Sequence, residues 1–312
     1  MAIMKIDMTE VEEMEQMISL QKVTKKFKDK KAVNEISFSI NKGEVVAILG
    51  PNGAGKSTTM LMMLGLLEPT SGSVSIFNQN PKDKQVRERI GAMLQEVSVI
   101  DALKVKEVIQ LFRSYYPSPM DFTELVQFTG LNEDDLKRKA DKLSGGQKRR
   151  LGFALALSGN PDVLFFDEPT VGMDISSRKR FWDTIQALKE RGKTIIFSTH
   201  YLQEADDVAE RILLFHEGVI VADGTPKEIK RKLSKQSVSF IYQDGLPLEE
   251  LRSLSVVSEI YEKNNRVYVV TEETDDIIAY LFEKKLKVQG IQVEQGRLDD
   301  AFAELTEKKE AI

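Results

Sequence analysis

Short apolar runs separated by polar, glycine-containing segments make up much of the first 230 residues. Unbroken runs of four or five apolar residues are typical of strands buried on both faces of a parallel sheet. Residues 32–40 instead alternate between apolar and polar, as a half-buried antiparallel strand does. The pattern therefore predicts a mixed α/β core, with strands at 18–23, 32–40, 45–49, 74–77, 91–95, 163–166, 194–197 and 212–215.

Residues 96–160 interrupt this strand pattern. Apolar residues there recur at a spacing of three or four, which is typical of amphipathic helices. Val105, Val108 and Phe112 form one such series, and Leu151 and Leu155 belong to another. We expect a helical subdomain inserted between two strands of the sheet.

Past residue 230 the pattern changes again. It predicts strands at 238–242, 256–261, 266–271 and 288–293, and helices at 248–254 and 275–286. The resulting βαββαβ order is typical of a small ferredoxin-like domain. The predicted domains are an N-terminal extension over 1–16, an α/β domain over 17–230, and a C-terminal α+β domain over 231–312 that ends in a helix near 298–308.

Composition narrows the class of protein. The 312 residues are 41% hydrophobic and 30% charged, with a formal net charge of −5 and no cysteine. The mildly acidic balance argues against nucleic acid as the main partner. The absence of cysteine excludes disulfides and thiolate metal sites. No run approaches the 18 or so apolar residues that span a bilayer, so we expect another chain to supply any membrane part.

Residues 50–58 carry the strongest chemical signal. They read Gly-Pro-Asn-Gly-Ala-Gly-Lys-Ser-Thr, which fits the phosphate-binding pattern G-x-x-x-x-G-K-[ST] between a predicted strand and a predicted helix. The glycines let successive backbone N–H groups curl round a phosphate, and the helix N-terminus adds its positive end. Lys56 brings a cation to the β- and γ-phosphates, and Ser57 offers a hydroxyl to Mg²⁺. We therefore predict a P-loop NTPase core.

Two further strand ends carry groups suited to nucleotide hydrolysis. The run 163–166 leads into Asp167 and Glu168. Asp167 can hold the Mg²⁺ shell, and Glu168 can polarise water for attack on the γ-phosphorus. His200 ends the next predicted strand and could contact the γ-phosphate. Taken alone, an acidic pair after a strand can simply begin a turn, and a strand-end histidine is often structural.

Leu143-Ser144-Gly145-Gly146-Gln147 lies inside the helical stretch. It can be interpreted as a capping box, with Ser144 as N-cap and Gln147 at the third helical position. Two glycines weaken a helix start, however, and they let bare N–H groups approach an anion. A chain with two phosphate-binding helix ends far apart in sequence makes most sense if two copies share each nucleotide.

Residues 18–225, which contain these motifs, resemble the nucleotide-binding subunits of ATP-binding cassette (ABC) transporters. Residues 50–57 match the Walker A motif, 143–147 the signature sequence and 163–168 Walker B. Gln95 matches the Q-loop glutamine, Asp174 the D-loop aspartate and His200 the switch histidine. Phe27 matches the adenine-stacking aromatic, usually Tyr; it could also simply pack at a sheet edge.

The resemblance implies a head-to-tail dimer, homomeric or heteromeric, that sandwiches two ATP molecules and drives a separate transmembrane permease at the cytoplasmic face of the membrane. The C-terminal residues 298–306 resemble the tail of subunits that work with export permeases. We predict Glu168, His200, Lys56 and Gln95 as catalytic residues, and Ser57, Gln95 and Asp167 as Mg²⁺ ligands. The predicted ATP-binding residues are Phe27, Val33, Asn52, Gly53, Ala54, Gly55, Lys56, Ser57, Thr58, Ser144, Gly145, Gly146, Gln147 and Asp174.

Other functions fit parts of this pattern. A soluble ABC ATPase acting on DNA or ribosomes would share the motifs, but its relatives carry long coiled coils or two cassettes, which are absent here. A small-molecule kinase would use the P-loop but leave residues 143–147 unexplained. An ABC subunit that regulates or confers immunity is not separable from a transporter on the sequence alone.

Overall fold

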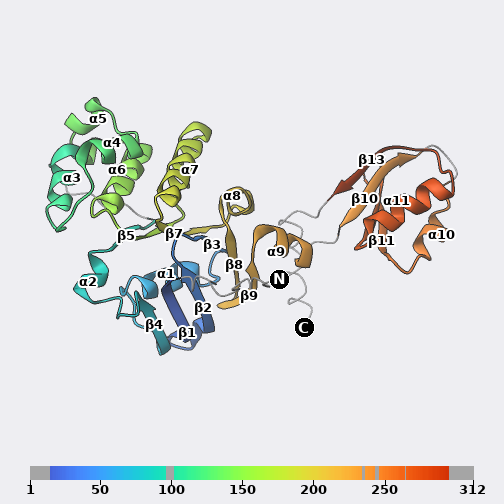
Figure 1. Cartoon of the computed structure of the whole chain (residues 1–312), viewed down its shortest axis with the longest axis horizontal. Helices are drawn as coiled ribbons and strands as arrows, with labels where there is room; N and C mark the ends of the chain where they lie inside the picture. The colour runs from blue at the N-terminus through green and yellow to red at the C-terminus, as the bar shows by residue number, and fades with distance from the viewer. Residues whose placement is uncertain (1–14, 96–101, 234–235, 243–245, 264, 295–312) are drawn as a thin grey trace, which may run out of the picture. The chain divides into compact units, whose positions relative to one another are not determined.

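The computed structural model describes residues 15–95, 102–233, 236–242, 246–263 and 265–294 (Figure 1). The chain divides into two compact units, one of residues 1–200 with 214–221 and the other of residues 201–213 with 222–312. The predicted domain boundary near 230 stays a prediction. Most of the predicted extension 1–16 and the predicted helix at 298–308 lie outside the described residues.

A six-stranded sheet lies mainly in the first unit, and residues 211–213 and 222–224 of its last two strands are counted in the second. Its order is β5 (Ile90–Met93), β6 (Val163–Asp167), β7 (Thr194–Thr199), β3 (Val45–Leu49), β8 (Arg211–His216) and β9 (Val219–Gly224). The four strands from β5 to β3 pair in parallel. Every residue of β3, β6 and β7 is buried, which is why these strands read as unbroken apolar runs. Strand β9 was not predicted from the sequence.

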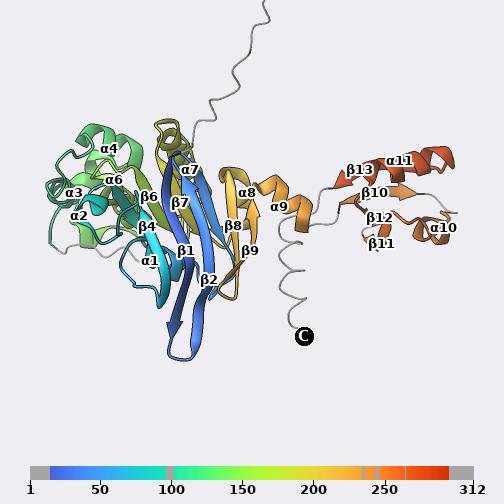
Figure 2. The same cartoon turned by 60° about the horizontal axis from the view of Figure 1, so that its bottom comes forward.

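A second, antiparallel sheet has the order β2 (Lys30–Asn41), β1 (Gln16–Phe27) and β4 (Ser71–Ile76). Figure 2 shows β1 and β2 as long neighbouring strands. Buried and exposed residues alternate along much of β2, as predicted for a half-buried strand. Phe27 is the last residue of β1 and lies opposite Lys30, just before the turn to β2.

Helices flank the large sheet and form the predicted helical insertion. Helix α1 (Lys56–Met63) follows the P-loop, α2 (Lys84–Arg87) precedes β5, and α7 (Ile175–Glu190) follows β6. Within the insertion, the described elements are α3 (Val105–Arg113), α4 (Phe122–Thr129), α5 (Glu133–Lys137), a 3₁₀ turn (Ala140–Lys142) and α6 (Gly145–Leu157).

An aromatic cluster joins the insertion to the sheet. Phe153 of α6, Phe166 of β6 and Phe181 of α7 lie with ring centroids 5.0–5.5 Å apart. Aromatic pairs at such separations add to the stabilisation that burial gives. The cluster therefore holds α6, the signature helix that begins within residues 143–147, and α7 against β6, the strand that leads into Asp167 and Glu168.

The second unit contains α8 (Leu202–Val208), α9 (Pro226–Leu233) and a four-stranded sheet. The elements β10 (Ser237–Tyr242), α10 (Leu248–Arg252), β11 (Val257–Lys263), β12 (Arg266–Thr271), α11 (Thr274–Glu283) and β13 (Val288–Glu294) follow the predicted βαββαβ order. The sheet order is β11-β12-β10-β13, with all neighbours antiparallel. Its core is built from Val238, Phe240, Leu251, Val267, Val269, Ile277 and Leu281. The ferredoxin-like assignment stays a prediction.

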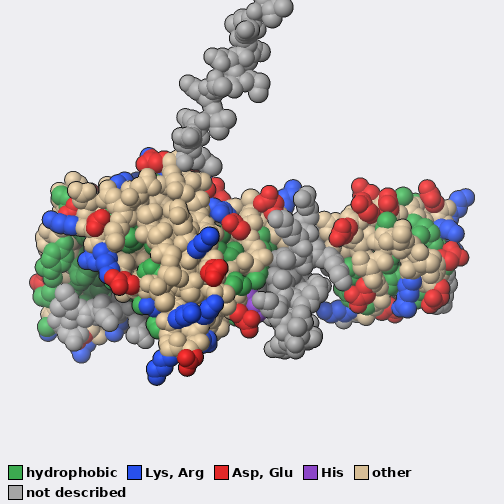
Figure 3. Space-filling model, turned by 90° about the horizontal axis from the view of Figure 1, so that it is seen from below, with side chains coloured by type: hydrophobic (Ala, Val, Ile, Leu, Met, Phe, Trp, Pro, Cys, Tyr) green, Lys and Arg blue, Asp and Glu red, His purple; other side chains and the backbone are tan. Residues whose placement is uncertain are grey.

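On the face drawn in Figure 3, acidic and basic side chains are interspersed. No helix in the described part of the chain has the length and apolar character that a membrane span requires.

We expect Phe181→Ala to destabilise the first unit. Phe181 is buried against Phe153 and Phe166, so truncation removes apolar contacts and leaves a cavity that costs about 3–5 kcal/mol. Urea unfolding of the full chain measures this loss. Gln186→Ala, on the exposed side of the same helix, is the control and should change the free energy of unfolding by less than about 0.5 kcal/mol. Equal effects of the two substitutions would contradict the packing role of the cluster.

Candidate nucleotide-binding and catalytic site

The carboxyl ends of three neighbouring strands bring the predicted motifs together. In the sheet register, Leu49 of β3 lies opposite Thr199 of β7, and Asp167 of β6 lies opposite Ser198. The P-loop, the Asp167-Glu168 pair and His200 therefore follow adjacent strand ends. This edge of a parallel sheet is where α/β folds place their ligands.

The P-loop adopts a backbone that favours glycine. Gly53 and Gly55 have φ values of 82° and 101°, which residues with a Cβ rarely adopt. A Cβ on Gly55 would also lie 2.5 Å from the carbonyl oxygen of Ala32. Gly55 is the N-cap of α1 and supplies no side-chain cap, so the first N–H groups of α1 are suited to bind a phosphate.

Lys56 lies buried at the start of α1. Its Nζ donates hydrogen bonds to the carbonyl oxygens of Gly50 (2.7 Å) and Pro51 (3.0 Å). Burial lowers the pKa of the ammonium, while the nearby charges of Glu168 and Asp167 raise it. The cation is therefore held within the loop, close to both carboxylates, by neutral acceptors that a phosphate can replace.

The residues at the start of α1 and the end of β6 fit a magnesium ion. The Ser57 hydroxyl donates to Asp167 Oδ1 at 3.3 Å, so two oxygen ligands of the predicted set lie side by side. No group of three or more His, Cys, Asp or Glu side chains forms a metal cage within the described ranges. Mg²⁺ commonly uses one or two protein oxygens together with water and substrate phosphates, and this pair suits that mode.

Glu168 is held at three points. Its backbone N–H donates to Ser198 Oγ (2.9 Å), and Ser198 in turn donates to Asp167 Oδ1. Its carbonyl oxygen accepts from Nη1 of Arg149 at 2.9 Å, and His200 Nδ1 lies 3.1 Å from its Oε1. Glu168 has a φ of 48°, a conformation that is unfavourable for a non-glycine residue. These contacts offset that strain and orient the carboxylate.

Arg149 is a residue that the sequence analysis did not single out. It lies on α6, two residues past the signature motif, and its Nη1 also donates to the carbonyl oxygen of Pro169 at 3.1 Å. Burial lowers the pKa of its guanidinium, and the charge of Glu168 opposes that shift. Arg149 contacts carbonyl groups that lie 19 and 20 residues away in sequence, so the local pattern does not predict these contacts. The only sequence signal at this position is the basic run 148–150.

The signature motif forms the capping box that its spacing allowed. The Ser144 hydroxyl accepts from the Gln147 N–H (3.3 Å), and the Ser144 N–H donates to Gln147 Oε1 (2.8 Å). Gly145 and Gly146 are exposed, and a Cβ on either would meet nothing within 4 Å. Among the described residues no hydrogen bond joins 144–146 to the P-loop, so one chain does not bring the two motifs together.

The remaining predicted residues occupy varied positions. Phe27 is 49% exposed, with Lys25 Nζ 5.2 Å from its ring centroid. Val33 is buried beside Gly55. Gln95 is exposed two residues past β5. Within the P-loop, Asn52 is exposed, Ala54 is buried and Thr58 is half-buried.

Asp174 caps α7. Its carboxylate accepts from the Ser177 N–H and from the hydroxyls of Ser176 and Ser177, and these bonds hold its pKa well below the usual range.

Known proteins are similar to this chain over much of its length. A family described as ABC transporter matches residues 33–171. Nod factor export ATP-binding protein I of Burkholderia orbicola (strain AU 1054) is 34% identical over 264 residues, which cover 82% of this chain and 87% of the relative. Linearmycin resistance ATP-binding protein LnrL of Bacillus subtilis (strain 168) is 29% identical over 306 residues, covering 93% and 98%.

Solved structures give the same result. A dimeric bacterial ABC transporter cassette superimposes with a TM-score of 0.62 at 30% identity, over 67% of this chain and 99% of that one. The dimeric post-hydrolysis state of the same cassette, bound to ADP and Pi, superimposes equally well at 30% identity and with the same coverage. The chain therefore belongs to the ABC transporter family, in which it is an ATP-binding cassette with ATPase activity.

Proposed function

We propose that this protein is the ATP-hydrolysing subunit that drives a separate membrane permease in export, working at the cytoplasmic face of the membrane. The observation that carries the proposal is the edge of the sheet where Lys56, Asp167, Glu168 and His200 meet. Export as the direction of transport is supported by two relatives, one named for the export of Nod factor and the other for resistance to linearmycin.

Each residue of this edge has a chemical task. The Glu168 carboxylate accepts a proton from the attacking water, while His200 Nδ1, 3.1 Å from Oε1, keeps the other carboxylate oxygen directed at that water. Lys56 exchanges its two carbonyl acceptors for the β- and γ-phosphate oxygens. A cation and phosphate-facing N–H groups at this position stabilise the charge that develops during in-line attack.

Ser57 and Asp167 would hold Mg²⁺, with Gln95 as a third oxygen ligand. The ion supplies charge neutralisation on the phosphates. Ser198 contributes indirectly, because its hydroxyl links Asp167 to the Glu168 N–H. Movement of the metal-binding carboxylate is thereby coupled to the position of the catalytic one.

Two copies of the chain complete each site in this proposal. Gly145 and Gly146 at the start of α6 are exposed, and the N–H groups of a helix start suit an anion. The dimeric state of the similar cassette supports a dimer here. Both halves of the site are present in this one sequence, so a homodimer could hydrolyse ATP at two sites.

A second surface suits the permease. A cavity of about 320 Å³ lies between the end of α1, β5, α3 and α6. Its lining is largely apolar and includes Leu66, which is 61% exposed, together with Phe112 and Tyr116. A hollow lined by apolar side chains suits an apolar anchor residue of a partner. We assign it to a cytoplasmic helix of the permease.

Glu168→Gln should leave ATP affinity unchanged and lower kcat by about 10²–10⁴-fold, because the amide cannot accept the proton of the attacking water. Steady-state phosphate release measures the rate, and light scattering with ATP present should detect a stable dimer of this variant. The control is Glu190→Gln, an exposed substitution at the end of α7, with wild-type turnover. Rapid hydrolysis by Glu168→Gln would rule out Glu168 as the base.

Arg149→Gln should lower kcat by about tenfold with little change in KM for ATP. It removes a charged donor from the carbonyl groups of Glu168 and Pro169, and a hydrogen bond to a charged group contributes about 1.5–3 kcal/mol. Arg149→Lys should recover part of the rate. Lys137→Gln, on the exposed side of α5, is the charge-matched control. A change in KM alone would contradict a positioning role.

Leu66→Asp should abolish co-purification with the permease, since it places a charge in the apolar lining. Leu66→Met preserves that lining and is the control. Because Leu66 is largely exposed, both variants should keep the wild-type thermal midpoint of the isolated subunit. Retention of the permease by Leu66→Asp would exclude this cavity as the docking surface.

A further inference from the structure

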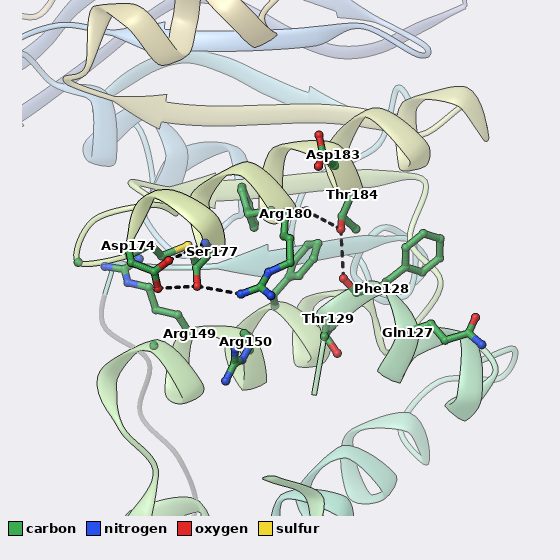
Figure 4. A pocket seen from close by; sticks show the side chains of 16 residues that line it. Gln127, Phe128, Thr129, Arg149, Arg150, Asp174, Ser177, Arg180, Asp183 and Thr184 are labelled. Carbon is green, nitrogen blue, oxygen red and sulfur yellow. Dashed lines mark hydrogen bonds between the residues drawn. The ribbon is translucent and has the colours of Figure 1, made fainter. Parts of the chain in front are cut away.

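A cavity of about 300 Å³ lies between helices α4, α6 and α7 (Figure 4). No residue of the P-loop lines it, so it lies outside the glycine loop that would hold the phosphates. Two predicted ATP-binding residues of the other half-site, Gly146 of the signature motif and Asp174 of the D-loop, lie along it. The cavity therefore touches both elements that flank the predicted dimer site, while remaining large enough for a small organic molecule.

Aromatic side chains provide the apolar part of the lining. Phe153 and Phe181 are almost fully buried, and their rings lie 5.0 Å apart with a tilt of 59°. Phe128 and Met173 add further apolar surface. Flat aromatic surfaces of this kind stack favourably with a planar ring.

Three arginines provide the polar part. Figure 4 shows the Arg180 side chain extending from α7 toward α6, which carries Arg149 and Arg150. Arg149 donates to two backbone carbonyls, and Arg180 Nη2 donates to the Ser177 hydroxyl at 3.3 Å. Within the described ranges, neither guanidinium forms an ion pair with a carboxylate. Arg150 pairs with Asp135 at 3.6 Å, yet its buried Nε has no hydrogen-bond acceptor.

The acidic residues of the lining leave N–H donors of two of these guanidinium groups unoccupied. Asp174 already accepts from the hydroxyls of Ser176 and Ser177 and from the Ser177 N–H. Figure 4 shows Asp174 bonded to Ser177. Asp183 is exposed, as Arg180 is. Because Asp135 pairs with Arg150, the guanidinium groups of the lining that no carboxylate pairs with, within the described ranges, are those of Arg149 and Arg180. Such a lining favours an anion that can accept from planar N–H donors.

We propose that this cavity binds a planar aromatic anion of one or two rings that carries a carboxylate or sulfonate group. The ring lies against Phe128, Phe153 and Phe181, and the acid group accepts from Arg180 and Arg149. Because Arg149 also holds the carbonyl of Glu168, an anion that engages it weakens the support of that residue. Occupancy therefore slows hydrolysis without excluding ATP, a consequence that rests on the proposed role of Glu168.

The test is a titration of the full-length protein with 5-(dimethylamino)naphthalene-1-sulfonate, a planar two-ring system that bears one sulfonate and whose fluorescence rises in apolar surroundings. We expect saturable binding of one probe per chain that a non-hydrolysable ATP analogue does not displace. Arg180→Gln should weaken the apparent Kd by about tenfold, since it removes one charged donor. Phe128→Leu, which keeps an apolar side chain but removes the ring, should also weaken binding.

Lys179→Gln is the matched control, because Lys179 is exposed on α7 and does not line the cavity; it should bind the probe as the wild type does. Displacement by the ATP analogue would overturn the proposal, as would equal affinities of the wild type and Arg180→Gln. The rate effect is measured separately: the probe should lower kcat and leave KM for ATP unchanged, and Arg180→Gln should need more probe for the same fractional loss. If kcat does not change when the cavity is fully occupied, the inhibitory role is wrong. The binding proposal would still stand, because the fluorescence titration measures binding without ATP turnover.

Discussion

The parallel pairing of β3, β6 and β7 is the constraint on which the rest of the structure depends. Parallel strands place their carboxyl ends at one edge, and here each end carries a different part of the site. Complete burial of the three strands ties the register to the apolar core, because any slip would disturb side chains packed on both faces. The site is therefore as rigid as the core beneath it.

Strain at one backbone position is offset by polar contacts. Glu168 has a left-handed φ, and its N–H, carbonyl and carboxylate each have a partner, one from α6 and two from the end of β7. Strained positions of this kind persist only where the surroundings hold them, and they concentrate at functional sites. One of these partners, Arg149, comes from the signature helix, so the helical insertion and the catalytic carboxylate are mechanically linked within one chain.

The aromatic cluster and the arginine-lined cavity belong to the same junction. Phe153 and Phe181 pack on Phe166 on one side and line the cavity on the other. The junction between α6 and α7 thus serves both stability and chemistry. Any molecule bound there would act on the contact between the signature helix and the Walker B strand, which offers a physical route from a remote ligand to the rate of hydrolysis.

The local sequence pattern was sufficient to predict the buried strands β3, β6, β7 and β8, because each is a short apolar run. It was also sufficient to predict the glycine loop with its lysine and the capping box of Ser144 and Gln147, because each of these depends on residues close in sequence. The contact of Arg149 with Glu168, the hydroxyl bridge of Ser198 and the approach of His200 to Glu168 join residues 19–32 positions apart. Strand β9 and the position of Phe27 at the end of β1 also depended on pairing with other strands. By itself the sequence determined which chemical groups this protein carries. Only the tertiary structure decided which of them meet, since side-chain contacts depend on sheet register and helix packing, which local periodicity does not specify.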